Sequence, residues 1–358
     1  MLLTIPYPSW LKPEIIPGLP LRWYGLMYLV AFGIAYLLFR RQVKERRFPM
    51  GEDEIYGLFF WGIIGLLLGA RIFSTLVYET SDIYRLRPWL IFWPFRDGRF
   101  TGLMGMSYHG GAIGGTLAVI IYTAVRRYSF REIGDMVAVC IPLGYTFGRL
   151  GNFINAELYG RVTAGPLGMI FPRAAPLPAG EAWVRELAEQ TGAALGGAWV
   201  NLPRHPSQLY EALFEGVILW AILWLCRNRK PFKGFLIGLY FIGYGFFRFF
   251  IEYFREPDED LGYRIELVRN SLPAALSHPP LSFSTGQILS FGMIVFGVVW
   301  IVIASRLPGR EAIRVYGDED PAGNRTGFAA GGPGGKMAEA ADKTAERNRR
   351  RKLRRRLR

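Results

Sequence analysis

Residues 55–77 read IYGLFFWGIIGLLLGARIFSTLV, and this stretch decides the fold class. Its only charged side chain is that of Arg71. A helix needs roughly 20 mainly apolar residues to cross about 30 Å of hydrocarbon, and this run is long enough. The sequence therefore predicts a transmembrane helix here.

Comparable apolar runs recur on both sides of this stretch. Glycine is frequent inside them, as in Gly110-Gly111 and Gly114-Gly115, and small residues let membrane helices pack closely. We therefore expect an all-α, polytopic membrane protein with seven tightly packed transmembrane helices. The predicted spans are residues 21–39, 55–77, 103–125, 133–153, 208–226, 234–253 and 283–304.

Composition and charge agree with this class. Hydrophobic residues make up 51% of the chain, and the net charge is +14 at pH 7. Such a charge often indicates nucleic-acid binding, but here much of it lies in short loops between apolar runs and in residues 347–358. This distribution is typical of membrane topology and of contact with anionic headgroups. Membrane lipids, and no nucleic acid, are the expected partners.

The distribution of lysine and arginine predicts the orientation. Basic residues follow the first, third, fifth and seventh spans, and the positive-inside rule makes these segments cytoplasmic. The N-terminus is then outside and the C-terminus inside. We see no cleaved signal peptide, so the first span is expected to act as its own insertion signal.

Three further segments complete the predicted domain organisation. Residues 88–94 form an aromatic stretch that is too short to span and is expected at the outer membrane interface. Residues 157–206, with a helix at 181–190, are expected to form a small external subdomain within a transferase domain of residues 1–307. Residues 308–358 are expected to be a disordered, basic cytoplasmic tail. The tail fits a solvated charge run, with anionic lipid or ribosomal RNA contact as the alternative.

Polar and ionisable side chains gather at the outer ends of six spans. Such residues are costly within a bilayer and therefore indicate a function. On the predicted topology they lie at similar depth on one face of the membrane. They are Tyr24, Arg71, His109, Arg149, Asn152, Asn155, Glu157, His205, Ser207, Gln208, Tyr210, Glu211, Tyr244, Arg248, Glu252 and Arg255.

The spacing of the last four residues places them on one helical face, since they are separated by four, four and three positions. Arg248 and Glu252 are therefore expected to pair. The alternative to a role in the functional site is that this ion pair is purely architectural. Adding Arg71 and Arg149 predicts an excess of arginine over carboxylate. A phospholipid phosphate is the available anion, and the planar guanidinium group suits it.

His109 is the candidate general base, with a satisfied core histidine as the alternative. An imidazole titrates near neutral pH, and the adjacent Gly110-Gly111 allows close approach of the backbone. His205 has a weaker case because His205-Pro206-Ser207 resembles a helix cap. Glu157 and Glu211 are expected to orient arginines or substrate. No metal-binding motif is present, and Cys140 and Cys226 give neither a disulfide framework nor a metal spacing.

Residues 148–160, GRLGNFINAELYG, closely resemble the signature of the prolipoprotein diacylglyceryl transferases. Segments 106–111 (MSYHGG), 205–211 (HPSQLYE) and 22–25 (RWYG) are similar to other motifs of the family, as is the run from Tyr244 to Asp258. Tyr108 stands where phenylalanine is common. The resemblance covers about residues 10–305, in order.

The resemblance implies a transferase that moves the diacylglyceryl group of phosphatidylglycerol onto the lipobox cysteine of a bacterial prelipoprotein, without a cofactor. It implies a multi-pass protein of the bacterial cytoplasmic membrane, which we expect to be a monomer, with its active site at the outer face. The expected catalytic residues are Tyr24, His109, Arg149, Tyr244 and Arg248. The expected substrate-binding residues are Arg71, Arg149, Asn152, Asn155, Glu157, Gly160, His205, Gln208, Glu252 and Arg255.

The residues bear on three other functions. A lipid or solute transporter would need polar groups at mid-depth and in the cytoplasmic half of the spans, which look almost purely apolar here. A membrane scaffold or receptor does not need histidine and arginine at matched depth. A transferase with a different acceptor is the third alternative. A lipidation assay would distinguish it from the diacylglyceryl transferase that the resemblance implies.

Overall fold

The computed structural model is dominated by long apolar helices. It describes residues 4–16, 18, 22–79, 82–96, 99–100, 105–195, 197–256, 263–266, 275–276 and 282–308. The predicted tail falls outside the described residues except for residue 308.

The helices coincide with the predicted spans, and the all-α membrane fold class is confirmed. In the described part of the chain, six helical segments are long and apolar enough to cross a membrane, and α9 (Phe235–Ile251) is a shorter apolar helix. Two of the six contain a π-helical turn. The six are α1 (Trp23–Glu45), α2 (Glu52–Phe73) with η1 (Ser74–Tyr78), α4 (Tyr108–Arg126), α5 (Phe130–Ile154), α7 (Ser207–Glu211) with η3 (Ala212–Ile218) and α8 (Leu219–Cys226), and α10 (Thr285–Arg306).

The described residues belong to two compact units. The first comprises those of Met1–Gln42 and Gly134–Ile313, and the second those of Val43–Ile133. In the first unit, α9 and α10 approach closely at glycines. A Cβ atom on Gly238 would lie 2.9 Å from the carbonyl oxygen of Gly297, so neither position has room for a side chain.

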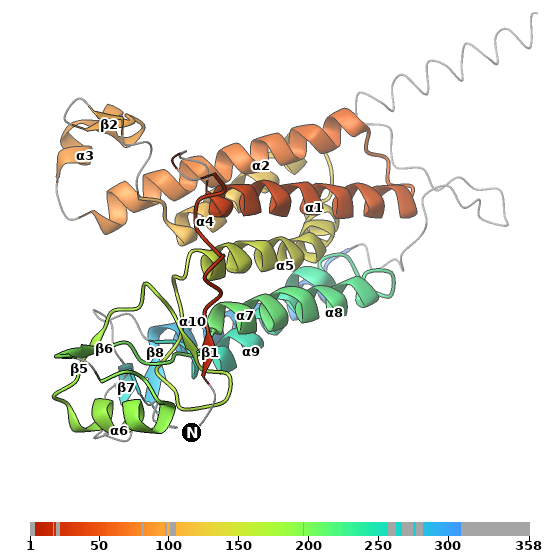
Figure 1. Ribbon diagram of the computed structural model, residues 1–358. Helices are drawn as coiled ribbons and strands as arrows, with labels where there is room; N and C mark the ends of the chain where they lie inside the picture. Colours follow the sequence, from red (N-terminus) through yellow and green to blue (C-terminus); the bar gives the residue numbers. More distant parts are fainter. Residues whose placement is uncertain are drawn as a thin grey trace, which may run out of the picture. The chain divides into compact units, whose positions relative to one another are not determined.

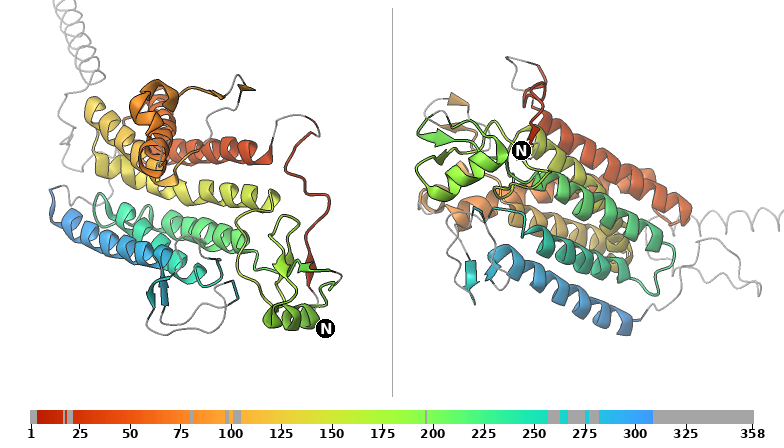
Figure 2. Two further views of the ribbon diagram at one scale, coloured as in Figure 1. Left: turned by 90° about the vertical axis from the view of Figure 1, so that its left-hand side faces the viewer. Right: turned by 60° about the horizontal axis from the view of Figure 1, so that its bottom comes forward.

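Short elements gather at one end of the first unit's long helices, as Figures 1 and 2 show. The predicted helix at 181–190 is confirmed as α6 (Ala182–Thr191). Residues 157–206 have a core of their own, formed by Val162, Val184, Leu187, Ala188, Val200 and Leu202. The strand pairs are β1 (Ile5–Pro6) with β4 (Met169–Ile170), in parallel, and two antiparallel pairs, β5 (Leu177–Pro178) with β6 (Trp199–Val200) and β7 (Tyr263–Glu266) with β8 (Ser282–Ser284).

In the second unit, α2 and α4 pack along facing glycines. A Cβ atom on Gly69 would lie 2.3 Å from the carbonyl oxygen of Gly110, and one on Gly114 would lie 2.2 Å from that of Gly65. The tight packing expected from glycine is therefore confirmed for this helix pair. The unit also contains α3 (Ile83–Leu86), η2 (Pro88–Ile91) and the hairpin of β2 (Phe95–Arg96) and β3 (Arg99–Phe100).

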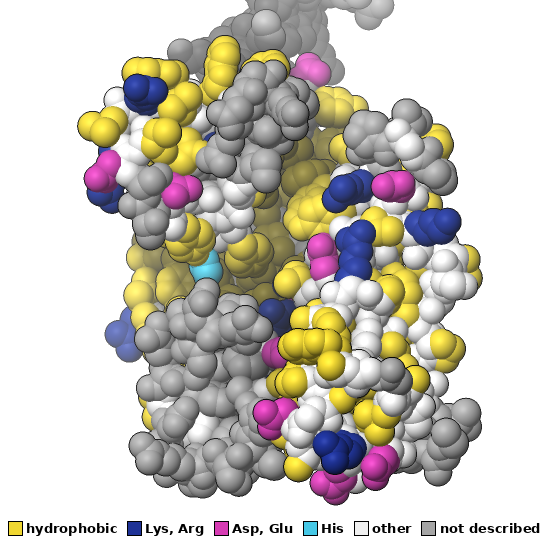
Figure 3. Space-filling model, turned by 60° about the vertical axis from the view of Figure 1, so that its left-hand side comes forward, with side chains coloured by type: hydrophobic (Ala, Val, Ile, Leu, Met, Phe, Trp, Pro, Cys, Tyr) yellow, Lys and Arg dark blue, Asp and Glu magenta, His cyan; other side chains and the backbone are white. Residues whose placement is uncertain are grey.

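Hydrophobic side chains remain exposed along the helices, as expected where lipid replaces water. Leu29, Val125 and Leu225 each expose more than two thirds of their surface. Figure 3 shows hydrophobic side chains in several patches between charged and other side chains. A soluble protein rarely leaves so many large apolar side chains of its helices uncovered. Trp89 and Trp93 of the aromatic stretch are also exposed, which fits the interfacial position that we predict.

Candidate active site

Glu211, the last residue of α7, is the centre of an arginine cluster in the first unit. Its carboxylate lies 2.8 Å from Nε of Arg149 on α5, 3.2 Å from Nη1 of Arg248 on α9, and 2.8 Å from Nη1 of Arg255 just beyond α9. The Glu211 side chain is completely buried. Three separate segments therefore bring their guanidinium groups to one carboxylate, and Glu211 pairs with arginines, as one of its two expected roles requires.

Glu252 supports the same arginines from the end of α9. Its Oε2 lies 3.1 Å from Nη2 of Arg248, so the pair predicted from the four-residue spacing is confirmed. The hydroxyl group of Ser284 donates to Oε1 of Glu252 at 3.1 Å. A Cβ atom on Gly286 would lie 2.5 Å from that oxygen, so the start of α10 closes tightly over the carboxylate. Glu252 is thereby fixed in place, and with it Arg248.

The cluster contains two further residues that the sequence pattern did not reveal, partly buried Tyr145 and fully buried Glu215. Tyr145 lies one helical turn before Arg149, and its ring lies 4.7 Å below the Arg149 guanidinium carbon. Glu215 lies four residues after Glu211, with its Oε1 3.9 Å from Nη1 of Arg248. Four-residue spacing could have identified both. Glu215 lies inside an apolar run, where hydropathy predicts no charge.

Glu215 also corrects the expected excess of arginine. Within the described part of this cluster, three guanidinium groups face three carboxyl groups, those of Glu211, Glu215 and Glu252. The reason for the error is that only the Arg248–Glu252 pair was counted. The number of arginines therefore does not by itself predict an anion site.

The exposure of the side chains distinguishes the two kinds of charge. The arginines keep part of their surface open, 18% for Arg149, 16% for Arg248 and 15% for Arg255, whereas the carboxylates are 0–8% exposed. The carboxylates are thus more deeply buried than the arginine side chains that pair with them. A partly exposed arginine suits the binding of a phosphate.

The loop after α5 is held in a rare conformation by polar side chains. Ala156 and Leu158 have φ values of 52° and 56°, in the left-handed region that residues other than glycine seldom adopt. The side-chain amides of Asn152 and Asn155 donate to Oε1 of Glu157 at 3.0 and 3.2 Å. Asn152 also accepts from Nη1 of Arg149 at 3.3 Å. This network joins the loop to the arginine cluster.

Gln208 connects the same loop to the start of α7. Its Nε2 donates to the carbonyl oxygen of Glu157 at 2.7 Å, and the hydroxyl group of Ser207 donates to that of Leu158 at 3.2 Å. Both side chains are completely buried. Asn152, Asn155, Glu157 and Gln208, all predicted as site residues, are therefore brought together beside Arg149.

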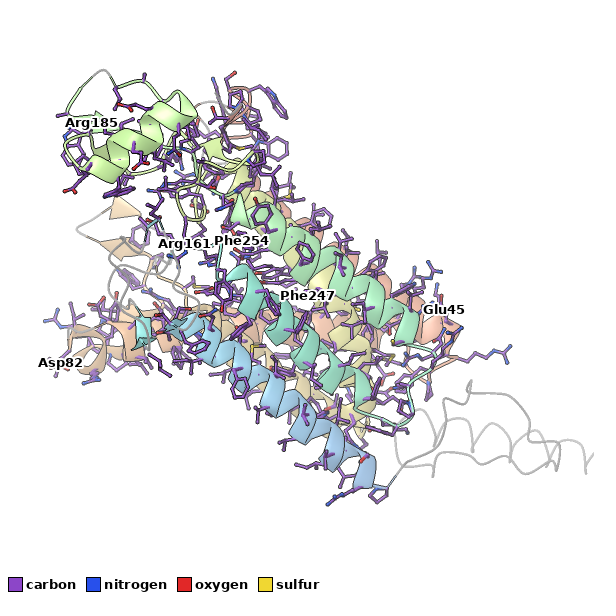
Figure 4. The ribbon with its side chains drawn as sticks, turned by 90° about the horizontal axis from the view of Figure 1, so that it is seen from below. Glu45, Asp82, Arg161, Arg185, Phe247 and Phe254 are labelled. Atoms are coloured by element: carbon purple, nitrogen blue, oxygen red, sulfur yellow. The ribbon has the colours of Figure 1, made fainter. Side chains whose placement is uncertain are left out.

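Gly160 lies where three chain segments cross. Its N–H donates to the carbonyl oxygen of His205 at 2.8 Å, and the next N–H, of Arg161, donates to that of Phe254 at 2.9 Å. A Cβ atom on Gly160 would lie 2.1 Å from the latter oxygen, so only glycine fits. Figure 4 shows Arg161 and Phe254 beside each other at this crossing. The crossing positions Arg255, which pairs with Gly160 across a β-bridge.

His205 packs against the aromatic rings of Phe254 and Tyr210. Its ring lies 5.2 Å from that of Phe254, and Tyr210 lies within 3.4 Å of its Nδ1. Burial lowers the pKa of His205, and the positive charge of Arg161 lowers that pKa further. These contacts point to a packing role.

The two predicted tyrosines belong to the first unit. The ring of Tyr24 packs on Gly151 of α5, where a Cβ atom would lie 3.2 Å from Cδ2 of the ring. Its hydroxyl group lies 2.9 Å from that of Tyr28. Tyr244 is buried on α9, with its ring 5.8 Å from that of Tyr145.

His109 and Arg71 belong to the second unit. His109 is exposed in the first turn of α4, where the hydroxyl group of Ser107 caps the helix by accepting from N–H of Gly110. Its Nδ1 lies 2.8 Å from the hydroxyl oxygen of Tyr78, a partner that the sequence analysis did not identify. The signal was weak, since Tyr78 ends a span far from His109 in the chain.

Arg71 is buried and donates to two backbone carbonyl groups. Its Nε donates to Ile91 at 2.5 Å and its Nη1 to Gly105 at 3.2 Å. Its guanidinium carbon lies 5.5 Å from the ring centre of Tyr84. Arg71 thus anchors the segment between α2 and α4. In the described part of the chain, no group of three His, Cys, Asp or Glu side chains is placed to hold a metal ion.

Comparison with known proteins shows the family to which the chain belongs. The family model for prolipoprotein diacylglyceryl transferase matches residues 13–303. The phosphatidylglycerol–prolipoprotein diacylglyceryl transferase of Treponema denticola is 57% identical over 323 residues, covering 85% of this chain and 95% of that protein. The enzymes of the same name from Treponema pallidum and Chlorobaculum tepidum are 51% and 42% identical, with 87% and 82% of this chain covered and 99% and 91% of theirs. The predicted resemblance is confirmed, and the chain belongs to the prolipoprotein diacylglyceryl transferase family.

Proposed function

We propose that this chain transfers the diacylglyceryl group of phosphatidylglycerol to the thiol of a prolipoprotein cysteine, as the names of its relatives state for them. Family membership makes the chain a transferase, so the predicted enzyme class is confirmed. The observation that carries the substrate assignment is the set of three arginine side chains that pair with buried Glu211 and keep 15–18% of their surface exposed.

The chemistry requires a thiolate and a stabilised leaving group. The thiolate sulfur attacks the glyceryl carbon next to the phosphate, the carbon–oxygen bond breaks, and glycerol phosphate leaves with the electron pair. A free cysteine of pKa about 8.5 is mostly protonated at neutral pH, so a base assists. In our proposal the thiol proton goes to His109, whose Nδ1 lies 2.8 Å from the hydroxyl group of Tyr78.

Arg149 and Arg248 are assigned to the phosphate. Each pairs with Glu211, and their side chains keep 18% and 16% of their surface exposed. Positioned donors of this kind act without reorganisation as charge develops on the leaving group. Asn152, Asn155, Glu157 and Gln208 hold the loop that follows Arg149. Glu252 pairs with Arg248, and Arg255 pairs with Glu252.

The proposed setting is the outer face of a bacterial cytoplasmic membrane. The N-terminus and residues 157–206 are outside, and residues 308–358 form the cytoplasmic tail of a monomer. What supports this is the concentration of lysine and arginine in alternate loops of the sequence. Residues 157–206, with their own core, are then available to a prolipoprotein arriving from outside.

A lipidation assay tests the function. Purified protein is incubated with phosphatidylglycerol and a lipobox peptide, and mass spectrometry looks for a diacylglyceryl mass on the cysteine. We expect this product with phosphatidylglycerol, none with diacylglycerol, and none with a peptide in which serine replaces cysteine. Absence of the product from folded protein would contradict the assignment, as would transfer to an acceptor other than the thiol.

A further inference from the structure

Glu215 and Glu211 meet at a single hydroxyl group. The hydroxyl oxygen of Tyr145 lies 2.5 Å from Oε2 of Glu215 and 3.0 Å from Oε2 of Glu211. Nε of Arg149 donates to the same oxygen at 2.7 Å. Both carboxyl groups are completely buried, so water does not separate them from the phenol.

The local fold forces Glu215 into this position. It lies in the π-helical turn η3, a kind of turn often found at functional sites. The next residue, Gly216, lets η3 press against α5, because a Cβ atom there would lie 2.0 Å from Oγ1 of Thr146. The hydroxyl group of Thr146 lies 3.3 Å from the carbonyl oxygen of Ala212, within the same turn.

Counting hydrogens shows that one proton is missing if both carboxyl groups are ionised. The phenol has one hydrogen, and an ionised carboxylate has none. Two oxygen–oxygen contacts at hydrogen-bond distance would then share a single hydrogen. Leaving a buried polar contact without its hydrogen is costly, so one of the two carboxyl groups must bring its own proton.

The surroundings decide which carboxyl group carries the proton. Glu211 has three guanidinium groups within 3.2 Å, which favour its ionised form. Glu215 has Arg248 at 3.9 Å, and its Oε1 has no hydrogen-bond partner among the described residues. An ionised carboxylate that is buried and weakly paired is strongly disfavoured.

We propose that Glu215 is a neutral carboxylic acid in the resting protein and acts as a positioning residue. The O–H of Glu215 donates a hydrogen bond to the phenol oxygen of Tyr145, and the O–H of Tyr145 donates one to Glu211. Together these hydrogen bonds fix Arg149 and Arg248 for a lipid phosphate. This deepens the proposed function and rests on it. The groups that face Glu215 are Tyr145 and Arg149 of α5, Glu211 of α7, and Arg248 of α9.

The proton restores the charge that a phosphodiester requires. Within the ion pairs of the cluster, three guanidinium groups then face two ionised carboxylates, Glu211 and Glu252. One positive charge is left for the single negative charge of phosphatidylglycerol. The next carboxylate, Glu157, is engaged by the amides of Asn152 and Asn155.

Infrared spectroscopy of the purified protein in lipid nanodiscs tests the proton directly. A protonated carboxyl group has a carbonyl band that an ionised carboxylate lacks. We expect Glu215→Gln to remove such a band at neutral pH, whereas the matched variant Glu252→Gln leaves it. The Tyr145→Phe variant is expected to shift the band to higher frequency, because the hydrogen bond to the phenol is lost. A wild-type spectrum without a band assignable to Glu215 would overturn the proposal.

Steady-state kinetics provides the second readout. Glu215→Ala is expected to raise the KM for phosphatidylglycerol about tenfold or more, and Glu215→Gln, a neutral donor of similar size, to recover most of that loss. If Gln is as impaired as Ala while both variants remain folded, the proposal is wrong. If the band behaves as expected but the wild type lipidates no peptide, the proposed function fails and the proton placement stands.

Discussion

At the scale of single residues, the site depends on Glu211. Three arginines from α5, α9 and the segment after α9 converge on this one buried carboxylate. Replacing a buried ion pair as a whole can be neutral, but removing one partner leaves uncompensated charge and costs about 3–5 kcal/mol. Glu211 therefore controls both the geometry of the arginines and the stability of the helices that carry them.

The Glu211→Gln variant is expected to lose at least about 100-fold in kcat/KM, because the arginines lose the charge that aligns them. The lipidation assay measures this on protein whose folding is checked by thermal denaturation. Glu189→Gln, on an exposed position of α6, is the matched control and should behave like the wild type. Activity within twofold of wild type in Glu211→Gln would show that the arginines do not need this carboxylate.

His205 gives a prediction on pH. Its pKa is lowered in the folded protein by burial and by Arg161, so the unfolded chain binds a proton that the folded protein resists. The contribution of His205 to the free energy of unfolding is fully present above the pKa of the unfolded chain, about 6.5. This contribution is lost as the pH falls below that value toward the lowered pKa of the folded protein.

The Tm of the wild type should therefore decrease between pH 7.5 and 5.5 more than the Tm of a His205→Gln variant, whose side chain stays neutral. Thermal denaturation at a series of pH values measures both. If the Tm of the two proteins changes in parallel with pH, His205 does not contribute to the pH dependence of stability.

The sequence predicted much of the site at this scale because helical spacing is regular. Arg248 and Glu252 were placed on one face by their four-residue separation, and the pair is present. Glu215 and Tyr145 have the same spacing from Glu211 and Arg149, yet they lie inside apolar runs. The contact of Tyr78 with His109 depends on how α2 and α4 cross, which spacing along one helix does not give.

At the scale of elements, the length of the apolar runs predicted the helices. It did not predict the π-helical turns within them. Each predicted span corresponds to a helix, because hydrocarbon thickness constrains length strongly. The π-helical turns η1 and η3 were not predicted, since they depend on close packing against a neighbour, as Gly216 packs on Thr146. Gly160, expected to bind substrate, lies at a backbone crossing that no local pattern reveals.

The glycine contact between α2 and α4 gives a prediction for these elements. A valine at Gly69 would clash with the backbone of Gly110, and overpacking of this kind costs about 1–3 kcal/mol. We expect Gly69→Val to lower the Tm by several degrees and to reduce activity through the displaced start of α4. Gly62→Val on the same helix, where a Cβ atom meets nothing within 4 Å, is the matched control. Equal Tm values for the two variants would contradict the packing.

At the scale of the whole molecule, the chain divides its functional residues between two units. The arginine cluster, Tyr24, Tyr244, Gly160 and His205 belong to the first, and His109 with Tyr78 and Arg71 to the second. Family membership covers both, since the match extends over residues 13–303. Topology and the boundary at residue 308 stay predictions, and the tail lies outside the described residues apart from residue 308 itself.

Equilibrium binding of phosphatidylglycerol to purified protein tests the central claim most directly, because it separates anion binding from chemistry. Arg149→Gln and Arg248→Gln should each weaken binding about tenfold or more, while Arg185→Gln, exposed on α6, should not change it. Uncharged diacylglycerol should bind all four proteins alike. Unchanged affinity of both site variants for phosphatidylglycerol would contradict the assignment of these arginines to the lipid phosphate.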